Sequence, residues 1–420
     1  MLQSKLFTKT KKEAPADEVA KNAELLIRGG FIHKDMAGVY TFLPLGLRVL
    51  EKIETIIRNE MNAIGGVEMR TSVLQPKEVW EKSNRWSDDV VDNWFKTTLK
   101  SGSEIGLSWT NEESHVSLIK QYINSYKDLP VYPYDFKTMF RNESRAKSGI
   151  MRGREFYWKA LYSFSKDAAQ HEAFYEVIKQ SYKNIFSKVG IGHLTYLTFA
   201  SGGAFSKYSH EFQTVTAAGE DTIYIDEAKG IAVNKEVYTD DVLASLGLDK
   251  STLVEQRAIE VGNIFSLGTR FSEPFELSYT DEEGKSQLVI MGSYGIGLGR
   301  LMGTIVETLA DDKGIIWPEE VAPFKVHLLA LGTGSDANAD VFAKAAELHS
   351  LLESHGIEVL FDDRTGLSAG EKFADADLLG MPYRIVVSER SLKEGGYEVK
   401  RRTEEKGKIV GVDEVLVIVK

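Results

Sequence analysis

The sequence predicts an α+β protein with more than one domain, and three observations support this. The chain has 420 residues, more than one typical domain contains. Up to about residue 322, strand-like and helical stretches are mixed without a regular order. Beyond the proline-containing stretch 317–323, strand and helix alternate regularly. We therefore expect a larger domain over residues 1–322 and a smaller α/β domain over residues 323–420.

The first clear element is an amphipathic helix over residues 46–64. Its apolar residues recur every three or four positions and Gly65-Gly66 follows as a stop, with apolar positions Leu47, Leu50, Ile53, Ile57, Met61 and Ile64. Residues 67–76 then alternate apolar and polar side chains up to Pro76, which predicts a strand.

Two further strands are predicted within residues 134–164, separated by a polar, basic loop over residues 144–153. If Arg141 and Glu143 lie on the first strand, its period of two places them on one face, where they can hold a phosphate and a base amine. An isolated pair of this kind is more often a solvated ion pair. The loop and the returning strand favour the first interpretation, because they add four cations and an aromatic able to stack on a base: Arg145, Lys147, Arg152, Arg154 and Phe156.

The next landmark is a strand over residues 287–291, followed by a glycine-rich stretch over 292–299 and a helix with Arg300 in its first turn. The spacing matches neither a Walker loop nor the dinucleotide fingerprint. Alone, such a stretch more often indicates tight packing of a strand against a helix than a binding site.

The final part alternates strand and helix. The strands are expected at 324–331, 357–361 and 384–388, and the helices at 337–354 and 371–379.

Residues 110–113 place a hydroxyl and two carboxylates close together, in Thr110, Glu112 and Glu113. This group can cradle an amine. The alternative is a helix N-cap in which Thr110 caps and Glu113 completes the capping box.

Composition excludes several classes of site. The chain has no cysteine, which removes disulfides, a thiolate nucleophile and cysteine-ligated zinc. The net charge of -11 argues against a general nucleic-acid coat but allows a local basic surface. No stretch has the length and apolarity of a membrane span, and we expect a cytoplasmic protein. The short basic start, residues 1–12, leaves organelle import as the alternative.

Together these segments resemble the signature motifs of class II aminoacyl-tRNA synthetases, and the intervening sequence is similar to bacterial prolyl-tRNA synthetases along almost the whole chain. Residues 37–48 through 73–76 resemble motif 1, residues 140–143 with 149–156 resemble motif 2, and residues 292–300 resemble motif 3. Residues 361–364, 372–380 and 384–387 resemble the family's anticodon-binding domain.

The resemblance implies an antiparallel-sheet catalytic core flanked by helices over residues 1–322, and an α/β anticodon-binding domain over residues 323–420. Bacterial members carry a large editing insertion, where this chain has only a short bridge at about 225–261. Asn111 and Asn263 stand where many relatives have histidine, and Ala160 departs from a usual aspartate.

The implied activity is proline–tRNA ligation: L-proline and ATP, with Mg²⁺, form prolyl-adenylate, and the prolyl group passes to the 3′ end of tRNA(Pro). No structural zinc is expected, and the resemblance makes Glu260 and Asn263 candidates for contacts to the ribose or to the metal that accompanies ATP. The family's dimer-forming motif 1 implies a homodimer.

The resemblance also assigns roles to residues. Catalysis is implied for Arg141, Arg152 and Arg300. ATP binding is implied for these three with Glu143, Phe156, Glu260 and Asn263. Proline binding is implied for Thr110, Glu112, Arg141, Glu211 and Phe265, and anticodon contact for Arg364, Lys372 and Arg384.

Two alternatives remain to be separated from this reading. A threonyl enzyme uses a cysteine among its zinc ligands, and this chain has none. A noncatalytic synthetase-like regulator or tRNA-binding protein would be expected to lack the phosphate-binding arginines, whereas Arg141, Arg152 and Arg300 are all present.

Overall fold

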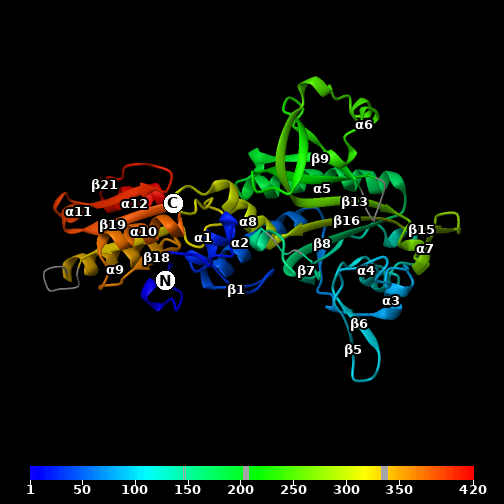
Figure 1. The fold of residues 1–420 in the computed structure, drawn as a ribbon, viewed down its shortest axis with the longest axis horizontal. Helices are drawn as coiled ribbons and strands as arrows, with labels where there is room; N and C mark the ends of the chain where they lie inside the picture. Colours follow the sequence, from blue (N-terminus) through cyan, green and yellow to red (C-terminus); the bar gives the residue numbers. More distant parts are fainter. Residues whose placement is uncertain (145, 147, 202–207, 333–338) are drawn as a thin grey trace. The chain divides into compact units, whose positions relative to one another are not determined.

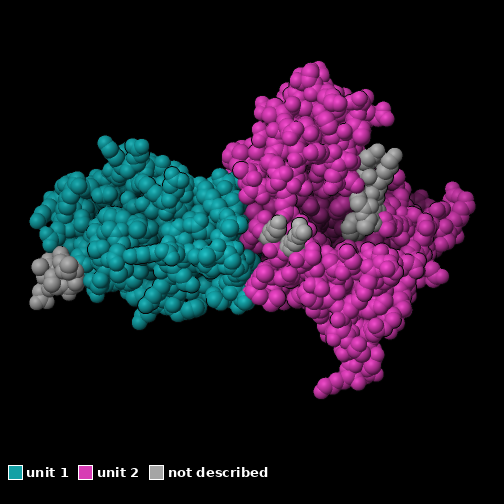
Figure 2. Space-filling model, in the orientation of Figure 1, with its two compact units in different colours: residues 1–35, 40–53, 305–420 teal, residues 36–39, 54–304 magenta. Residues whose placement is uncertain are grey.

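The computed structural model describes residues 1–144, 146, 148–201, 208–332 and 339–420. The chain forms two compact units, coloured separately in Figure 2. Unit 1 contains residues 1–35, 40–53 and 305–420, and unit 2 contains residues 36–39 and 54–304. Residues 1–35 and 40–53 pack with residues 305–420, so the compact units divide the chain differently from the domains expected over residues 1–322 and 323–420.

A nine-stranded sheet forms the centre of unit 2, in the order β10-β9-β12-β11-β13-β16-β8-β7-β3. Its neighbours are antiparallel except for the pairs β12–β9 and β3–β7. The sheet core expected from the sequence is therefore present, mainly antiparallel with two parallel pairings. Its strands are β3 (Val67–Glu68), β7 (Pro133–Phe140), β8 (Glu155–Ser165), β9 (Thr195–Ser201), β10 (Tyr208–Val215), β11 (Asp221–Asp226), β12 (Ile231–Asn234), β13 (Val254–Gly268) and β16 (Ile290–Gly297).

Five of these strands close on themselves, because the long strand β13 pairs with β11 near its start and with β10 further along. Residues 225–261, whose fold the sequence did not predict, contribute β12, the helix α6 (Asp240–Ser245) and the first half of β13 to this ring. Buried side chains of this segment form a small core of their own, which includes Val233, Val242 and Leu243.

One face of the sheet is covered by α5 (Ala168–Lys188), which contacts β8, β13 and β16 (Figure 1). Lys159 points to this side and is fully buried. Its Nζ donates to the hydroxyl of Tyr182 on α5 at 2.7 Å and to the carbonyl of Tyr294 at 3.0 Å. Burial lowers the pKa of Lys159 well below its ordinary value, and the two hydrogen bonds of its amine join the helix to the sheet.

The predicted helix 46–64 is confirmed as α2 (Pro44–Ala63), but the single strand predicted over 67–76 is wrong. β3 joins the central sheet, whereas β4 (Leu74–Pro76) pairs with β6 (Glu104–Leu107) in a separate sheet with β5 (Lys96–Thr98). Alternation of apolar and polar residues continues across the gap, so it cannot distinguish one strand from two strands with different partners.

The glycine-rich stretch is also different from the prediction. The predicted strand 287–291 is interrupted between β15 (Ser286–Leu288) and β16, and the glycines continue β16 as strand up to Gly297. The helix α8 (Leu298–Leu309) follows directly, which confirms Arg300 in its first turn.

Several shorter helices and strands also occur in the first 280 residues of the chain. They are α1 (Lys21–Arg28), β1 (Ile32–Met36), β2 (Val39–Phe42), α3 (Lys77–Glu81), α4 (Glu112–Ile119), α7 (Ser272–Phe275) and β14 (Ser278–Thr280). None of the helices in the described part of the chain has the length and apolarity needed to cross a membrane.

The C-terminal part of unit 1 contains a five-stranded sheet in the order β18-β17-β19-β20-β21. The three predicted strands are confirmed as β17, β18 and β19, and the predicted helices as α9 and α10; residues 337 and 338 lie outside the described residues. The bounds are β17 (Val326–Leu331), α9 (Ala339–Ser354), β18 (Val359–Asp362), α10 (Ala369–Leu379), β19 (Tyr383–Ser388), α11 (Glu389–Lys393), β20 (Tyr397–Arg401), β21 (Lys408–Val410) and α12 (Val412–Val419).

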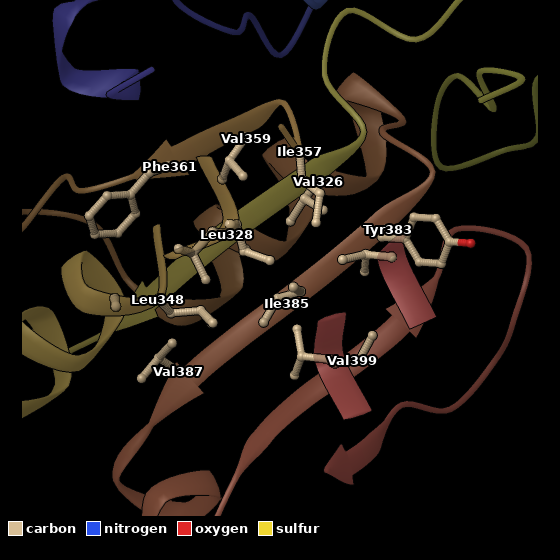
Figure 3. Packing of buried hydrophobic residues seen from close by; sticks show 14 of the residues in the cluster. Val326, Leu328, Leu348, Ile357, Val359, Phe361, Tyr383, Ile385, Val387 and Val399 are labelled. Carbon is tan, nitrogen blue, oxygen red and sulfur yellow. The ribbon is translucent and has the colours of Figure 1, made fainter. Parts of the chain in front are cut away.

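The core of this sheet provides a test of the packing. Ile385 on β19 is fully buried beside Leu328, Leu348 and Val399 (Figure 3). Ile385→Ala should therefore lower stability by about 2–5 kcal/mol, because it removes apolar contacts and leaves a cavity. Thermal unfolding followed by circular dichroism measures the change. Val417→Ala on α12, where the side chain is 77% exposed, is the matched control, and an equal shift in both variants would contradict the assignment of this core.

Candidate active site

A pocket in unit 2 is lined by all seven residues for which ATP binding was predicted. They come from the end of β7, the following loop, β8, β13 and the start of α8, and they are Arg141, Glu143, Arg152, Phe156, Glu260, Asn263 and Arg300. The sequence distance between these residues reaches more than 150 positions, so the sheet topology brings them together. The predicted loop cations Arg145 and Lys147 lie outside the described residues.

Arg141 lies just beyond β7 rather than on it, since that strand ends at Phe140. The prediction that Arg141 and Glu143 share a strand face is therefore wrong. The Arg141 guanidinium lies 5.2 Å from the ring centre of Trp109 and 5.4 Å from that of Phe156, and its Nε donates to the Trp109 carbonyl at 3.4 Å. Burial, and then the nearby cation Arg300, lower the pKa of Arg141. Two cations held so close together favour an anionic ligand between them.

Glu143 and Arg152 interact directly across the pocket. Arg152 donates to Glu143 Oε2 from Nε at 3.3 Å and from Nη2 at 3.0 Å, and its Nη1 reaches Glu220 at 2.7 Å. Arg152 thus sits between two carboxylates at the rim, with 42% of its side chain exposed. An anionic ligand would compete with these carboxylates for the guanidinium.

Arg300, Glu260 and Asn263 form a second group of residues that line the same pocket. Arg300 donates from Nε to the Met151 carbonyl at 2.9 Å and from Nη1 to the Glu260 carbonyl at 3.1 Å. Asn263 Nδ2 donates to Glu260 Oε1 at 2.7 Å. These bonds fix the direction of the Arg300 side chain before any ligand is present.

Trp158 also lines the pocket and packs against Gly295, and the sequence analysis assigned neither residue a role. Trp158 packs edge-on against Phe156, with ring centres 5.9 Å apart. A Cβ at Gly295 would lie 2.2 Å from the Trp158 ring and 2.8 Å from Asn263 Oδ1. Trp158 and Phe156 lie two positions apart on one strand, so their shared face was readable from the sequence. The close approach that requires Gly295 was not.

The predicted amine cradle also exists as a cluster, because Glu112 is buried among polar side chains. Its Oε2 accepts from Thr110 Oγ1 at 2.6 Å, and its Oε1 accepts from the Tyr162 hydroxyl at 2.9 Å. Arg85 Nη1 lies 3.3 Å from Glu112 and 3.0 Å from Glu113. The alternative N-cap interpretation is wrong: Asn111 occupies the N-cap position of α4, without a side-chain capping bond.

Burial acts strongly on the charges of this cluster. It lowers the pKa of Arg85, but Glu113 and Glu112 outweigh it and leave that pKa raised. It raises the pKa of Glu113, against the effect of Arg85. The sequence analysis missed Arg85 because nothing in its local pattern indicates that it pairs with carboxylates some 27 positions away.

The strand register places the proline-binding candidate Phe265 on the same sheet face as this cluster. Phe265 pairs with Ser293, and Ser293 pairs with Tyr162. Side chains at paired positions point to one face, and Ser293 Oγ reaches Glu112 Oε1 at 3.4 Å. Phe265 also packs against the apolar cluster that contains Tyr162.

Glu211 lies elsewhere on that face. It pairs with Asn263, which lines the pocket formed by the ATP-binding candidates (the ATP-candidate pocket). Its Oε2 accepts from Gln213 at 2.9 Å. Burial, and then the carboxylate of Glu260, raise its pKa to about 8. Within the described residues, its hydrogen bonds do not reach Glu112, so the register associates Glu211 with Asn263 and Glu260.

The three anticodon candidates in unit 1 are all engaged within the protein. Arg364 pairs with Asp362 at 2.7 Å and Asp375 at 2.8 Å, and Arg384 pairs with Asp377 at 3.0 Å. Lys372 is fully buried, and its Nζ donates to the Ala330 carbonyl at 2.8 Å. A buried amine cannot touch a nucleotide, so Lys372 packs α10 against the sheet and does not contact an anticodon.

Comparison with protein families identifies the class that this fold and pocket define. Residues 95–309 match the family described as tRNA synthetase class II core domain (G, H, P, S and T), and residues 325–420 match the family described as Anticodon binding domain. The chain is thus built as a class II aminoacyl-tRNA synthetase.

Individual relatives narrow the family. The chain is 37% identical over 427 residues to the proline–tRNA ligase of Wolbachia pipientis wMel, covering 99% of both chains. It is 32% identical to the proline–tRNA ligase of Sulfurihydrogenibium sp., in an alignment of 549 positions that covers 96% of each. The chain therefore belongs to the proline–tRNA ligase family. Since the second alignment is much longer than this chain, that relative contains residues that this chain lacks.

A solved structure shows the same fold. Prolyl-tRNA synthetase from Cryptosporidium parvum, complexed with L-proline and AMP, aligns with a TM-score of 0.77 at 17% identity. The alignment covers 94% of this chain and 73% of that one.

The raised pKa of Glu211 predicts how stability depends on pH. The folded protein keeps a proton on Glu211 up to pH about 8, whereas an unfolded chain releases it near the ordinary value of 4.5. Stability should therefore fall as the pH rises through this interval. Glu211→Gln keeps an acceptor for Gln213 but cannot ionise, so its melting temperature relative to the unsubstituted protein should increase from pH 5 to pH 8.5.

Glu283→Gln is the control, because the Glu283 side chain is 72% exposed. If the melting temperature of Glu211→Gln follows that of the unsubstituted protein in parallel over the whole interval, Glu211 does not hold a proton in the folded state.

Proposed function

We propose that this protein activates L-proline with ATP to form prolyl-adenylate and pyrophosphate, and then transfers the prolyl group to the 3′ end of tRNA(Pro). One observation carries the proposal: a pocket rich in arginine and a buried carboxylate cluster occupy one face of the same strands. Tyr162 and Ser293 contact Glu112, and Trp158 and Gly297 line the pocket four residues further along β8 and β16. Four residues of strand correspond to roughly 13 Å, a distance suited to two joined ligands.

The chemistry assigned to the arginines is electrostatic. The carboxylate of proline is ionised at neutral pH and attacks the α-phosphorus of ATP, so the protein has to align the two groups and stabilise the developing charge. Arg141 is assigned to the α-phosphate and the carboxylate, and Arg152 and Arg300 to the outer phosphates. Phe156 stacks on the adenine ring, and Glu143 accepts from its amine.

The ATP-candidate pocket is also suited to the Mg²⁺ that accompanies ATP. Magnesium prefers oxygen ligands and is usually held by one or two carboxylates together with substrate phosphates. Glu260 supplies such a carboxylate, which Asn263 orients through the bond to Oε1. We assign Glu260 to this metal and Asn263 to its orientation and to the ribose.

Specificity for proline is assigned to the cluster around Glu112. The secondary ammonium group of proline would be held by Glu112, with Thr110 beside it. Glu112 is only 2% exposed, so an ammonium group that replaces water there would meet a carboxylate already fixed by its neighbours. Phe265 and the apolar cluster behind it are assigned to the wall of the ring pocket. Glu211, which the register associates with Asn263, is assigned to the ATP side rather than to proline.

Pyrophosphate exchange dependent on each of the twenty amino acids tests this function, because activation needs no tRNA. Exchange should be strongest with proline. Arg141→Ala should reduce it by about 10²–10³-fold, since one preorganised charge contact in a transition state contributes this much. Arg390→Ala, whose side chain is 77% exposed, is the matched control and should retain full exchange.

Exchange with a different amino acid would overturn the proline assignment. No exchange with any amino acid would favour the noncatalytic synthetase-like protein instead. Such a protein would be expected to lack the phosphate-binding arginines, whereas Arg141, Arg152 and Arg300 all line the pocket.

We also propose a homodimer formed through the region that resembles motif 1. Two apolar side chains of this region that belong to unit 2 are exposed in the single chain, Val67 by 66% and Leu74 by 53%. Burial of such side chains against a second copy of the chain would remove their apolar surface from water. Sedimentation equilibrium should give twice the mass of one chain, and Val67→Glu should shift the equilibrium to monomer. A monomeric unsubstituted protein would contradict the proposal.

A further inference from the structure

The N-terminal segment is fixed along the C-terminal sheet of unit 1, beside β18 (Figure 1). Leu2 pairs with Phe361 on β18, and the buried Gln3 side chain bonds to His327 Nε2 at 2.8 Å. Ser4 binds Asp363 through both its backbone N–H and its hydroxyl, at 2.9 and 2.6 Å. The segment thus extends the region that matches the anticodon-binding family, although it lies more than 300 residues away in sequence.

Beyond Ser4 the segment stays attached to unit 1. Thr10 Oγ1 donates to Asp375 on α10 at 2.6 Å, and the backbone N–H of Lys11 donates to the Arg28 carbonyl at 2.8 Å. These bonds hold the backbone, and they leave the lysine side chains free to point outward.

Side chains along this segment alternate between the protein and the solvent. Leu6, Thr8 and Thr10 are half-buried, whereas the intervening positions Lys5, Phe7, Lys9 and Lys11 are exposed. Phe7 is 76% exposed, so its ring is open to contact from solvent. One edge of the segment therefore presents cations with an aromatic ring between them.

The segment also forms one wall of a groove of about 930 Å³. Among the described residues, its lining contains six cationic and three acidic side chains, although the whole chain is acidic. Lys9, Lys11 and Lys12 form no ion pair with another described residue, unlike Arg364, which is held by two carboxylates. Of the four groove cations without an ion pair among the described residues, three therefore lie on the N-terminal segment, and Lys313 is the fourth.

We propose that residues 5–12 form a contact surface for the tRNA, in which the lysines bind backbone phosphates and Phe7 stacks on an unpaired base. Cations that follow a backbone, with an aromatic ring between them, are the combination that single-stranded nucleic acid requires. This surface rests on the proposed ligase function and extends it by giving RNA a contact outside residues 323–420. It also compensates for the predicted anticodon cations, which are buried or paired.

The test uses the full-length protein and a tRNA(Pro) transcript. The variant K9Q/K11Q/K12Q removes three charges and should weaken tRNA binding roughly tenfold or more at moderate salt, because phosphate contacts are lost. Each lost contact should also reduce the slope of log affinity against log salt concentration by about one. Phe7→Ala should weaken binding by about fivefold or more without changing that slope. Binding is measured by fluorescence anisotropy between 50 and 300 mM salt, which is roughly the interval where phosphate contacts dominate.

The control K250Q/K285Q/K393Q removes the same charge from three lysines whose side chains are 62%, 68% and 79% exposed. Proline-dependent pyrophosphate exchange should be unchanged in every variant, since it needs no tRNA. If the N-terminal variants bind tRNA with the affinity and salt slope of the control, the contact surface is refuted while the ligase function stands. If the unsubstituted protein shows no exchange and no tRNA binding, the ligase function fails and this surface fails with it.

Discussion

The register of β13, β16 and β8 is the constraint on which the rest of the site depends. Pairing of Phe265 with Ser293 and of Ser293 with Tyr162 forms one row across the sheet, and pairing of Asn263 with Gly295 and of Gly295 with Ala160 forms the next. A slip of one residue would turn every one of these side chains to the face covered by α5. On the covered face, the buried hydrogen bonds of Lys159 to Tyr182 and Tyr294 stabilise this register.

A second constraint is the burial of charge around Glu112. Arg85, Glu112 and Glu113 are 5%, 2% and 0% exposed, so removing Arg85 would leave two buried carboxylates without their cation, at a cost of about 3–5 kcal/mol. Buried ion pairs add little stability compared with apolar packing, but this network fixes a carboxylate in one place and orientation. Recognition of a small cation needs that fixed geometry more than it needs the stability.

Some of this architecture was available from the sequence and some was not. Period-two and three-to-four-residue patterns located β7, β8, α2, α8 and the alternating elements of the C-terminal sheet, because burial on one face imposes those periods. The motifs then indicated the seven side chains that line one pocket. The confirmed helices and strands share a local cause, since each of their patterns lies within one element.

What failed depends on distant partners. The break between β3 and β4 depends on which strands each of them pairs with, and the ion pairing of Arg85 depends on carboxylates of a different element. In the sequence Lys372 cannot be distinguished from a surface lysine, because its hydrogen bond to the Ala330 carbonyl joins residues far apart in the chain. Arg141 was placed on a strand because alternation continues past Phe140, although the regular pairing ends there.

The segment between β12 and β13 has a consequence for how this protein can change its length. Its helix α6 and surrounding residues pack on their own small core, and Gly230 at the preceding turn has no atom within contact distance of an added side chain. Its two ends are held by β12 and β13, which both pair with β11 in the closed ring, so a longer chain could leave and re-enter there without moving the rows that carry the site. Such a place is a natural graft point, where evolution or an engineer can attach a second module to a working enzyme core.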